Sequence, residues 1–117
     1  MSYYYLATPY SKYPEGRPAA FDMACRQAAI LLKAKISVYC PIAHGHAIGD
    51  ANGIDPLDWD FWMEADAPMM EAAKGLIVVA APNWQHSRGI GQELRYFAGA
   101  LKPIVWMEVD ILPEEFR

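Results

Sequence analysis

Hydrophobic residues gather in four short runs along the chain, and proline stands at or near one end of each run. The runs are Tyr3–Ala7, Ile36–Cys40, Leu76–Ala81 and Pro103–Met107. Runs of this length, rich in aromatic and β-branched residues and bounded by turn-forming residues, are typical of strands buried in a sheet. The pattern therefore predicts four β-strands.

Between these runs, hydrophobic residues recur at the three- and four-residue spacing of an amphipathic helix. One helix begins near Pro18, which suits a first helical turn, a second follows Asp55 as N-cap, and a third begins near Gly89. Pro68 falls inside the second helix and predicts a kink or a restart near Asp66. The residues predicted to face the core are Phe21, Ala24, Cys25, Ala28 and Leu32, then Trp62, Ala65, Met69 and Ala73, and finally Leu94, Phe97, Ala98 and Leu101.

The alternation of strands and helices predicts parallel strands joined by right-handed crossovers, with helices on both faces of the sheet. We expect one domain over residues 1–117 of the α/β class, a Rossmann-like three-layer sandwich with a four- to five-stranded parallel sheet in flavodoxin-like order. Three polar segments follow the first three strands and are expected to be loops: Thr8–Arg17, Pro41–Asp55 and Pro82–Gly89. Carboxyl ends of parallel strands meet at one edge, so these segments predict a ligand site there.

The composition narrows the classes of partner. The chain has 117 residues, a formal net charge of −4 and 54% hydrophobic residues, which suits a packed globular domain. There is no long basic run for nucleic acid, no stretch of roughly 18 apolar residues for a membrane span, and no secretory signal at the N-terminus. Cys25 and Cys40 are typical of reduced thiols, and we expect a cytoplasmic protein whose partner is a small molecule.

The segment from Gly75 to Glu93 carries the strongest candidate for chemistry. A buried strand ends at Pro82, and Ser87 and Gly89 precede Glu93, which we place in the first turn of a helix. A carboxylate near a helix N-terminus is favoured in its ionised form and is suited to act as a nucleophile or base. A glutamate in the first turn of a helix is also common when it only complements the helix dipole, and this is the alternative for Glu93. For Asp66, the alternative is a plain N-cap. Neither a GxxxxGK[ST] nor a GxGxxG motif is present.

The three polar segments bring together hydroxyl groups, cations and aromatic rings, a set that suits a small polar ligand with an aromatic part, such as a nucleotide. Tyr5 is expected in the core, and so are Trp59, Phe61 and Trp62, although one of these rings could line a base pocket. The residues that we predict to contact substrate are Thr8, Tyr10, Ser11, Arg17, His44, His46, Trp84, Ser87 and Gly89.

Four residues at or after the end of the second strand also suggest a metal site. Cys40, His44, His46 and Asp50 are residue types that bind zinc, but their spacing matches no common structural zinc motif. We therefore predict no metal and no cofactor.

Several motifs together resemble one family. YLATPYS at 5–11, PIAHGHAI at 41–48, DWDFWMEAD at 58–66, NWQHSRGIGQE at 83–93 and GALKPIV at 99–105 are similar to the nucleoside 2-deoxyribosyltransferase-like superfamily, and most of all to its DUF1937 group. The most specific part is the S-x-G-x-x-x-E pattern of Ser87, Gly89 and Glu93. The resemblance implies cleavage or transfer at the N-glycosidic bond of a (2-deoxy)nucleoside or its 5′-monophosphate.

The resemblance also implies roles for individual residues. Glu93 would attack C1′ of the sugar, Tyr5 would orient Glu93 by a hydrogen bond, and Asp66 would help to protonate the departing base. Ser87 would contact the sugar 5′-hydroxyl or a 5′-phosphate. This division between an anion and an acid is the one that retaining glycosidases use.

Other functions remain open at this point. The chain could be a non-catalytic nucleotide-binding module in which Glu93 hydrogen-bonds a ribose hydroxyl, or a hydrolase of a nucleotide-sugar-like ligand. The resemblance implies a homodimer or higher homo-oligomer, and apolar surface is available if not all of Trp59, Phe61, Trp62, Met69, Met70 and Trp106 lie in the core.

Overall fold

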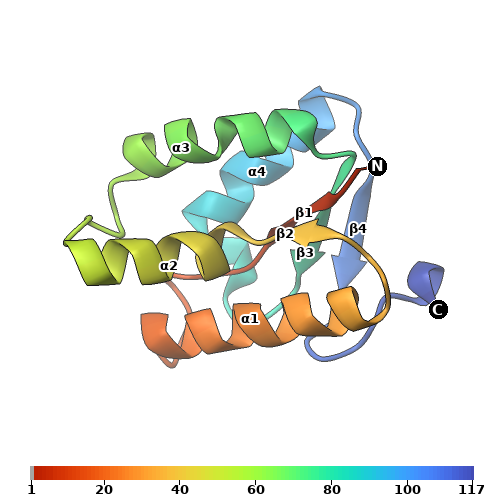
Figure 1. Cartoon of the computed structure of the whole chain (residues 1–117), viewed down its shortest axis with the longest axis horizontal. Coiled ribbons are helices and arrows are strands. Elements are labelled where there is room, and N and C mark those ends of the chain that lie inside the picture. Colours follow the sequence, from red (N-terminus) through yellow and green to blue (C-terminus); the bar gives the residue numbers. More distant parts are fainter. Residues whose placement is uncertain (1) are drawn as a thin grey trace.

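A single parallel sheet organises the chain (Figure 1). The computed structural model describes residues 2–117. Its strands are β1 (Tyr4–Ala7), β2 (Val38–Tyr39), β3 (Gly75–Val79) and β4 (Ile104–Met107), and they pair in the order β2-β1-β3-β4. This is the predicted flavodoxin-like order, with each strand somewhat shorter than its hydrophobic run. The α/β fold class predicted from the sequence is confirmed.

Helices cover both faces of the sheet and complete the three layers. Within residues 2–117 the structure has four α-helices, α1 (Arg17–Lys33), α2 (Pro41–Asn52), α3 (Trp59–Ala72) and α4 (Arg88–Gly99), and two short 3₁₀ turns, η1 (Trp84–His86) and η2 (Glu114–Phe116). One core cluster joins α1 to one face of the sheet, and a second joins α3 and α4 to the other face. No helix in this part of the chain is long and apolar enough to cross a membrane.

The loop predicted over Pro41–Asp55 is wrong, because most of this segment forms α2. Pro41 stands in the first turn of the helix, and Gly53 ends it in the left-handed conformation at φ 68°. Gly45 and Gly49 lie one turn apart on the buried side, where each Cα faces the ring of Trp62. Glycines weaken a helical pattern, yet here they are needed for the close approach of α2 to α3.

The start and the buried face of α3 also differ from the prediction. The N-cap is Asp58, which accepts a hydrogen bond from the Phe61 backbone N–H at 3.2 Å, and not Asp55. The helix continues through the exposed Pro68 without a restart near Asp66. Its inner face is formed by Met63, Asp66, Met70 and Ala73, whereas Ala65 and Met69 are exposed.

The predicted inner faces of α1 and α4 are correct only in part, since Ala24 and Phe97 are buried as predicted. In α1 the buried residues are Ala20, Met23, Ala24, Gln27 and Leu31, and the predicted Leu32 is exposed. In α4 they are Ile90, Glu93 and Phe97, and the predicted Ala98 and Leu101 lie outside. Each inner face carries one polar residue, and that residue interrupts the apolar periodicity from which the face was predicted.

Candidate functional site

A cavity of about 210 Å³ opens beyond the carboxyl ends of β1, β2 and β3, at the edge of the sheet where parallel strands place ligand sites. Its size suits a small ligand, since cavities for drug-sized molecules usually measure roughly 300–1,000 Å³. The segment after β1, helix α2, helix α3 and the start of α4 all contribute to the wall. The predicted site residues that line it are Thr8, Tyr10, Ser11, Arg17, His46, Asp66, Ser87, Gly89 and Glu93.

Glu93 lies on the inner face of α4, with 7% of its surface exposed. Ser87 is the N-cap of this helix and accepts a hydrogen bond from the Ile90 N–H, so Glu93 belongs to the second turn and not to the first. The helix dipole acts mainly within the first turn. Burial is the dominant influence and raises the pKa of Glu93 to about 8, with a hydrogen bond from Tyr5 opposing the shift and Asp66 adding to it. Burial therefore favours the protonated form of Glu93, in contrast to the ionised form that its place near a helix start predicts.

Asp66 is the second carboxyl of the cavity, and it comes from α3. It is half-buried and accepts a hydrogen bond from the Tyr39 hydroxyl at 3.1 Å. Burial raises the pKa of Asp66, while the Tyr39 hydrogen bond and the charge of His44 lower it. Asp66 is less buried than Glu93, and each of the two carboxyl groups receives a hydrogen bond from a tyrosine. The cavity thus holds two carboxyl groups whose pKa values are both raised by burial.

Two tyrosines support this pair from the sheet. Tyr5 is fully buried behind Glu93, and burial together with the neighbouring carboxyl groups raises the pKa of its hydroxyl, so that it remains a hydrogen-bond donor. Tyr39 stands beside it on β2 and binds Asp66. Sequence reasoning named Tyr5 and missed Tyr39. The available signal was its position at the carboxyl end of the second strand, equivalent to that of a site residue on the first.

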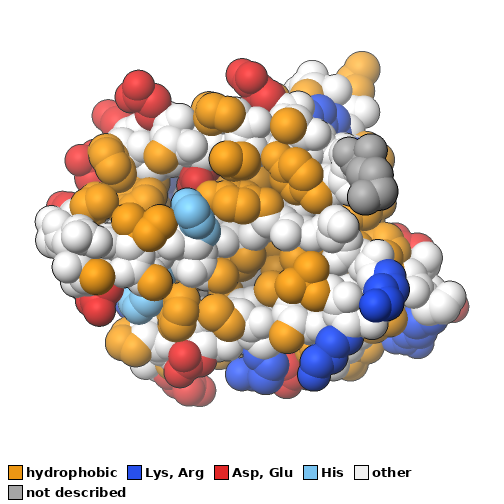
Figure 2. Space-filling view, viewed as in Figure 1, with side chains coloured by type: hydrophobic (Ala, Val, Ile, Leu, Met, Phe, Trp, Pro, Cys, Tyr) orange, Lys and Arg blue, Asp and Glu red, His pale blue; other side chains and the backbone are white. Residues whose placement is uncertain are grey.

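Two aromatic rings of α3 line the cavity. Trp59 and Trp62 on α3 are half-buried and line the cavity, whereas the sequence predicted them in the core. Hydrophobic side chains gather over α2 and α3 on the face seen in Figure 2. The signal for Trp59 and Trp62 was their spacing of seven and four residues before Asp66, which places all three on neighbouring helical turns.

Two buried polar atoms at the cavity lack a partner. The hydroxyl of Thr8 and the side-chain carbonyl oxygen of Gln92 make no hydrogen bond within the described residues, and both side chains line the cavity. Thr8 is only 4% exposed. A buried polar atom without a partner is costly, and a polar ligand would satisfy it.

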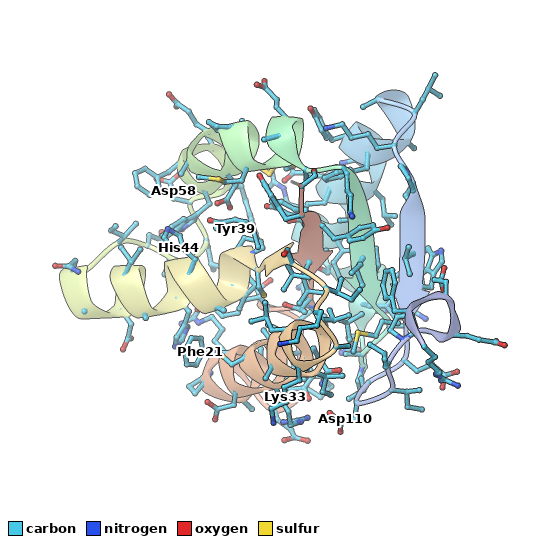
Figure 3. The ribbon with its side chains drawn as sticks, turned by 45° about the vertical axis from the view of Figure 1, so that its right-hand side comes forward. Phe21, Lys33, Tyr39, His44, Asp58 and Asp110 are labelled. Carbon is cyan, nitrogen blue, oxygen red and sulfur yellow. The ribbon has the colours of Figure 1, made fainter. Side chains whose placement is uncertain are left out.

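The two histidines of α2 have different surroundings. His46 lines the cavity, where its Nδ1 is hydrogen-bonded to the Tyr10 hydroxyl and its ring stacks on Phe21 at 4.5 Å between centroids. His44 lies outside the cavity beside Tyr39, with ring centroids 5.5 Å apart, in the space between α2 and α3 (Figure 3). Within residues 2–117, no three His, Cys, Asp or Glu side chains lie close enough together to hold a metal ion.

Trp84 also lies outside the cavity. Its ring packs on Trp106 of β4 with centroids 5.1 Å apart, in a T-shaped arrangement. The segment from Pro82 folds into the 3₁₀ turn η1, which carries this ring toward the β4 edge of the sheet. His44 and Trp84 are therefore the two predicted substrate contacts that do not line the site.

One family model matches most of the chain. The model described as "Domain of unknown function (DUF1937)" matches residues 2–109. The chain belongs to the DUF1937 family. The matched region includes every strand and every cavity-lining residue of this DUF1937 protein. No curated protein matches the chain.

A second hollow of the DUF1937 protein adjoins the cavity and is positively charged. It is lined by Ser11, Lys12, Arg17, Leu57, Trp59 and Arg88, and it shares Ser11, Arg17 and Trp59 with the cavity. The Arg88 guanidinium lies over the Trp59 ring, 5.4 Å from its centroid. Neither α1 nor α4, which begin beside this hollow, has an acidic residue in its first turn. The mouth of the site is therefore suited to an anionic group, whereas its interior carries the carboxyl pair.

Proposed function

We propose that this protein cleaves or transfers at the N-glycosidic bond of a (2-deoxy)nucleoside or nucleoside 5′-monophosphate, with Glu93 as the nucleophile. The observation that carries the proposal is the pair of carboxyl groups, Glu93 and Asp66, that meets in one cavity beside two indole rings. Glycosidic chemistry needs an anion at the sugar carbon and an acid at the leaving group. The similarity of the motifs to the nucleoside 2-deoxyribosyltransferase-like superfamily supports the same assignment.

The proposed reaction has two steps. In the first, a carboxylate oxygen of Glu93 attacks C1′, the bond from C1′ to the base nitrogen breaks, and Asp66 gives its proton to the base. The products are a glycosyl ester on Glu93, a neutral free base and an Asp66 carboxylate. In the second, Asp66 takes a proton from water or an acceptor base as that molecule attacks C1′, and Glu93 leaves as a carboxylate.

The protonation of the two carboxyl groups bears on this mechanism. Burial raises the pKa of Glu93 to about 8, which favours a proton on this carboxyl group near neutral pH. The reactive form has the same single proton on Asp66 instead, so the pair must exchange it before attack. Two interacting carboxyl groups titrate as a unit, and what matters is that the pair carries one proton in total.

An assay of free base released from a panel of deoxy- and ribonucleosides and their monophosphates tests the proposal. A second base is supplied in parallel as acceptor, which separates transfer from hydrolysis. Glu93→Gln should abolish release, and Glu108→Gln serves as the matched control because Glu108 is exposed beyond the end of β4. Absence of release from every member of the panel, with and without acceptor, would reject the glycosidic function.

A binding module without turnover is the second candidate, and the raised pKa of Glu93 favours it. A protonated Glu93 is a hydrogen-bond donor and suits a sugar hydroxyl better than it suits nucleophilic attack. Glutamine keeps the shape and the neutral charge of this group. A nucleotide that binds the wild type and Glu93→Gln with equal affinity, and is recovered intact from both, would support this second function.

We also propose that the protein works in the cytoplasm and self-associates. Both cysteines are free, and Cys40 is buried, as expected in a reducing compartment. Phe61, Met69 and Trp106 are exposed at 45%, 40% and 48%, whereas Met70 is buried. Sedimentation of the wild type and of Phe61→Ser measures the mass in solution. A wild-type monomer at working concentration would reject self-association.

A further inference from the structure

Tyr5 and Tyr39 are directly opposite each other on neighbouring parallel strands. They are register partners of β1 and β2, and their ring centroids are 5.8 Å apart. Both rings pack with the cluster that joins the sheet to α3 and α4. Side chains at paired positions of adjacent strands point to the same face of a sheet, so the two hydroxyl groups are directed toward the same two helices.

Each hydroxyl binds a different carboxyl group. Tyr5 hydrogen-bonds Glu93 on α4, and Tyr39 donates to Oδ1 of Asp66 on α3 at 3.1 Å. Figure 3 shows the Tyr39 side chain in the space between α2 and α3, with His44 beside it. One pair of neighbouring strand positions therefore supports both carboxyl groups of the cavity.

The charged and titratable groups around the pair come from every packed element. Tyr39 from β2 and His44 from α2 act on Asp66, while Tyr5 from β1 acts on Glu93, and the two carboxyl groups act on each other from α3 and α4. Among these, Tyr39 makes the described hydrogen bond to Asp66, whereas His44 acts through its charge alone. Tyr39 is thus the group whose removal changes Asp66 most directly.

We propose that Tyr39 is a positioning residue that holds Oδ1 of Asp66, so that Oδ2 remains to carry a proton and meet the ligand, as Tyr5 holds Glu93 on the neighbouring strand. This role rests on the glycosidic function proposed above. A carboxyl group that is held by one oxygen has a fixed direction for its other oxygen. Proton delivery to a departing base requires such a fixed direction, because misplacement by even about 1 Å is costly to catalysis.

Removal of the hydroxyl in Tyr39→Phe tests the proposal, with Tyr4→Phe as the matched control. Tyr4 neighbours Tyr5 on β1, but its ring packs with the opposite core cluster, against Phe116. For Tyr39→Phe we expect kcat to fall roughly 10- to 100-fold with KM little changed, the loss expected for one hydrogen bond to a charged group. The acidic limb of the pH profile of kcat/KM should also move to higher pH by about one unit, because the ionised form of Asp66 loses a donor.

A direct titration keeps the test independent of turnover. Carbon-13 NMR of the side-chain carboxyl groups follows Asp66 in the wild type, Tyr39→Phe and Tyr4→Phe. An upward shift of the Asp66 midpoint in Tyr39→Phe alone supports the positioning role. An unchanged midpoint, or an active Tyr39→Phe with the wild-type pH profile, would overturn it and leave the glycosidic function standing. A shifted Asp66 midpoint in Tyr39→Phe, together with no release of base by the wild type, would instead reject the glycosidic function.

Discussion

Trp62 on α3 lies so close to Gly45 on α2 that a Cβ added to the glycine would stand 3.0 Å from the indole ring. Gly49, one turn later, has the same relationship at 3.2 Å. Contacts this short force a neighbouring group to move, and Trp62 lines the cavity. The two glycines therefore determine how far the indole extends into the ligand site.

The first prediction concerns Gly45→Ala. Alanine in place of a helical glycine normally stabilises a protein by about 0.4–1 kcal/mol. At Gly45 the methyl group displaces Trp62, so we expect no gain in stability and a weaker affinity for the ligand. Gly99→Ala is the control, because a Cβ at Gly99 meets nothing within 4 Å. Urea unfolding and ligand titration of both variants check this, and a Gly45→Ala protein that is as stabilised as Gly99→Ala would contradict it.

The second prediction links Glu93 to stability. Its pKa is about 8 in the folded protein and about 4.3 in an unfolded chain. The folded state therefore binds the extra proton between these values, and the free energy of unfolding decreases as the pH rises from the lower value to the higher. Each pKa unit corresponds to about 1.4 kcal/mol, so the loss is at most about 5 kcal/mol.

Glu93→Gln removes this pH dependence because glutamine stays neutral and still accepts a hydrogen bond from Tyr5. Urea unfolding at about pH 5 and about pH 9 should show a variant that is more stable than the wild type only at the higher pH. Glu108→Gln should follow the wild-type curve, since Glu108 is exposed. Parallel curves for the wild type and Glu93→Gln would mean that Glu93 is ionised in the folded protein.

The strand order and the edge of the sheet that holds the cavity were predictable from the sequence, because both follow from a few robust local signals. The run Leu76–Ala81 is apolar at every position and gave β3, which is buried at every residue. The polar residues that follow the strands were likewise assigned to one edge. Parallel topology then leaves little freedom, since the carboxyl ends of the strands must share that edge.

Hydrophobic periodicity predicted the inner faces of the helices only in part: Ala24, Ala73 and Phe97 are buried as predicted. Gln27, Asp66 and Glu93 each occupy a position at which a hydrophobic residue would be expected, and each is accommodated by a tertiary partner. Gln27 exchanges hydrogen bonds with Asp110, 83 residues away in the chain. A local pattern cannot predict such long-range pairs. It also did not predict α2, because the glycines of this helix are explained only by their contact with Trp62 on another helix.

The third prediction is a bell-shaped pH dependence of base release. Above about pH 8 the pair loses its shared proton, since that is the pKa of Glu93, and no acid remains for the departing base. Below the pKa of Asp66, which burial raises, both carboxyl groups are protonated and no nucleophile remains. We therefore expect kcat/KM to decrease on both sides, with the basic limb near pH 8.

Asp66→Asn provides the matching test on the free protein. The charge of Asp66 raises the pKa of Glu93, so its removal should lower that pKa, as measured by carbon-13 NMR titration of the Glu93 carboxyl group. Glu64→Gln on the exposed side of α3 is the control and should leave the titration unchanged. Activity that keeps rising above pH 8 in the wild type would show that an ionised Glu93 acts without a proton from the pair.

The fourth prediction separates phosphorylated from unphosphorylated substrates at the mouth of the site. Arg17 and Arg88 line the hollow next to the cavity, together with Lys12. If a 5′-phosphate occupies this hollow, Arg17→Gln and Arg88→Gln should each raise KM for nucleoside monophosphates by roughly 10- to 100-fold, the loss expected for a hydrogen bond between charged groups. The KM for nucleosides should change by less than about twofold, because screened surface charges contribute little to a neutral ligand.

Arg95→Gln is the control for this experiment, since Arg95 is an exposed residue of α4 that does not line either hollow. Salt gives a second readout: added sodium chloride should weaken the wild type toward monophosphates and leave nucleosides unaffected. Equal increases of KM for both classes of substrate would mean that the arginines support the shape of the cavity and do not bind a phosphate. An increase of KM for monophosphates alone would indicate how the ligand binds. Its charged group would lie at the mouth, and its glycosidic bond would lie beside Glu93 and Asp66.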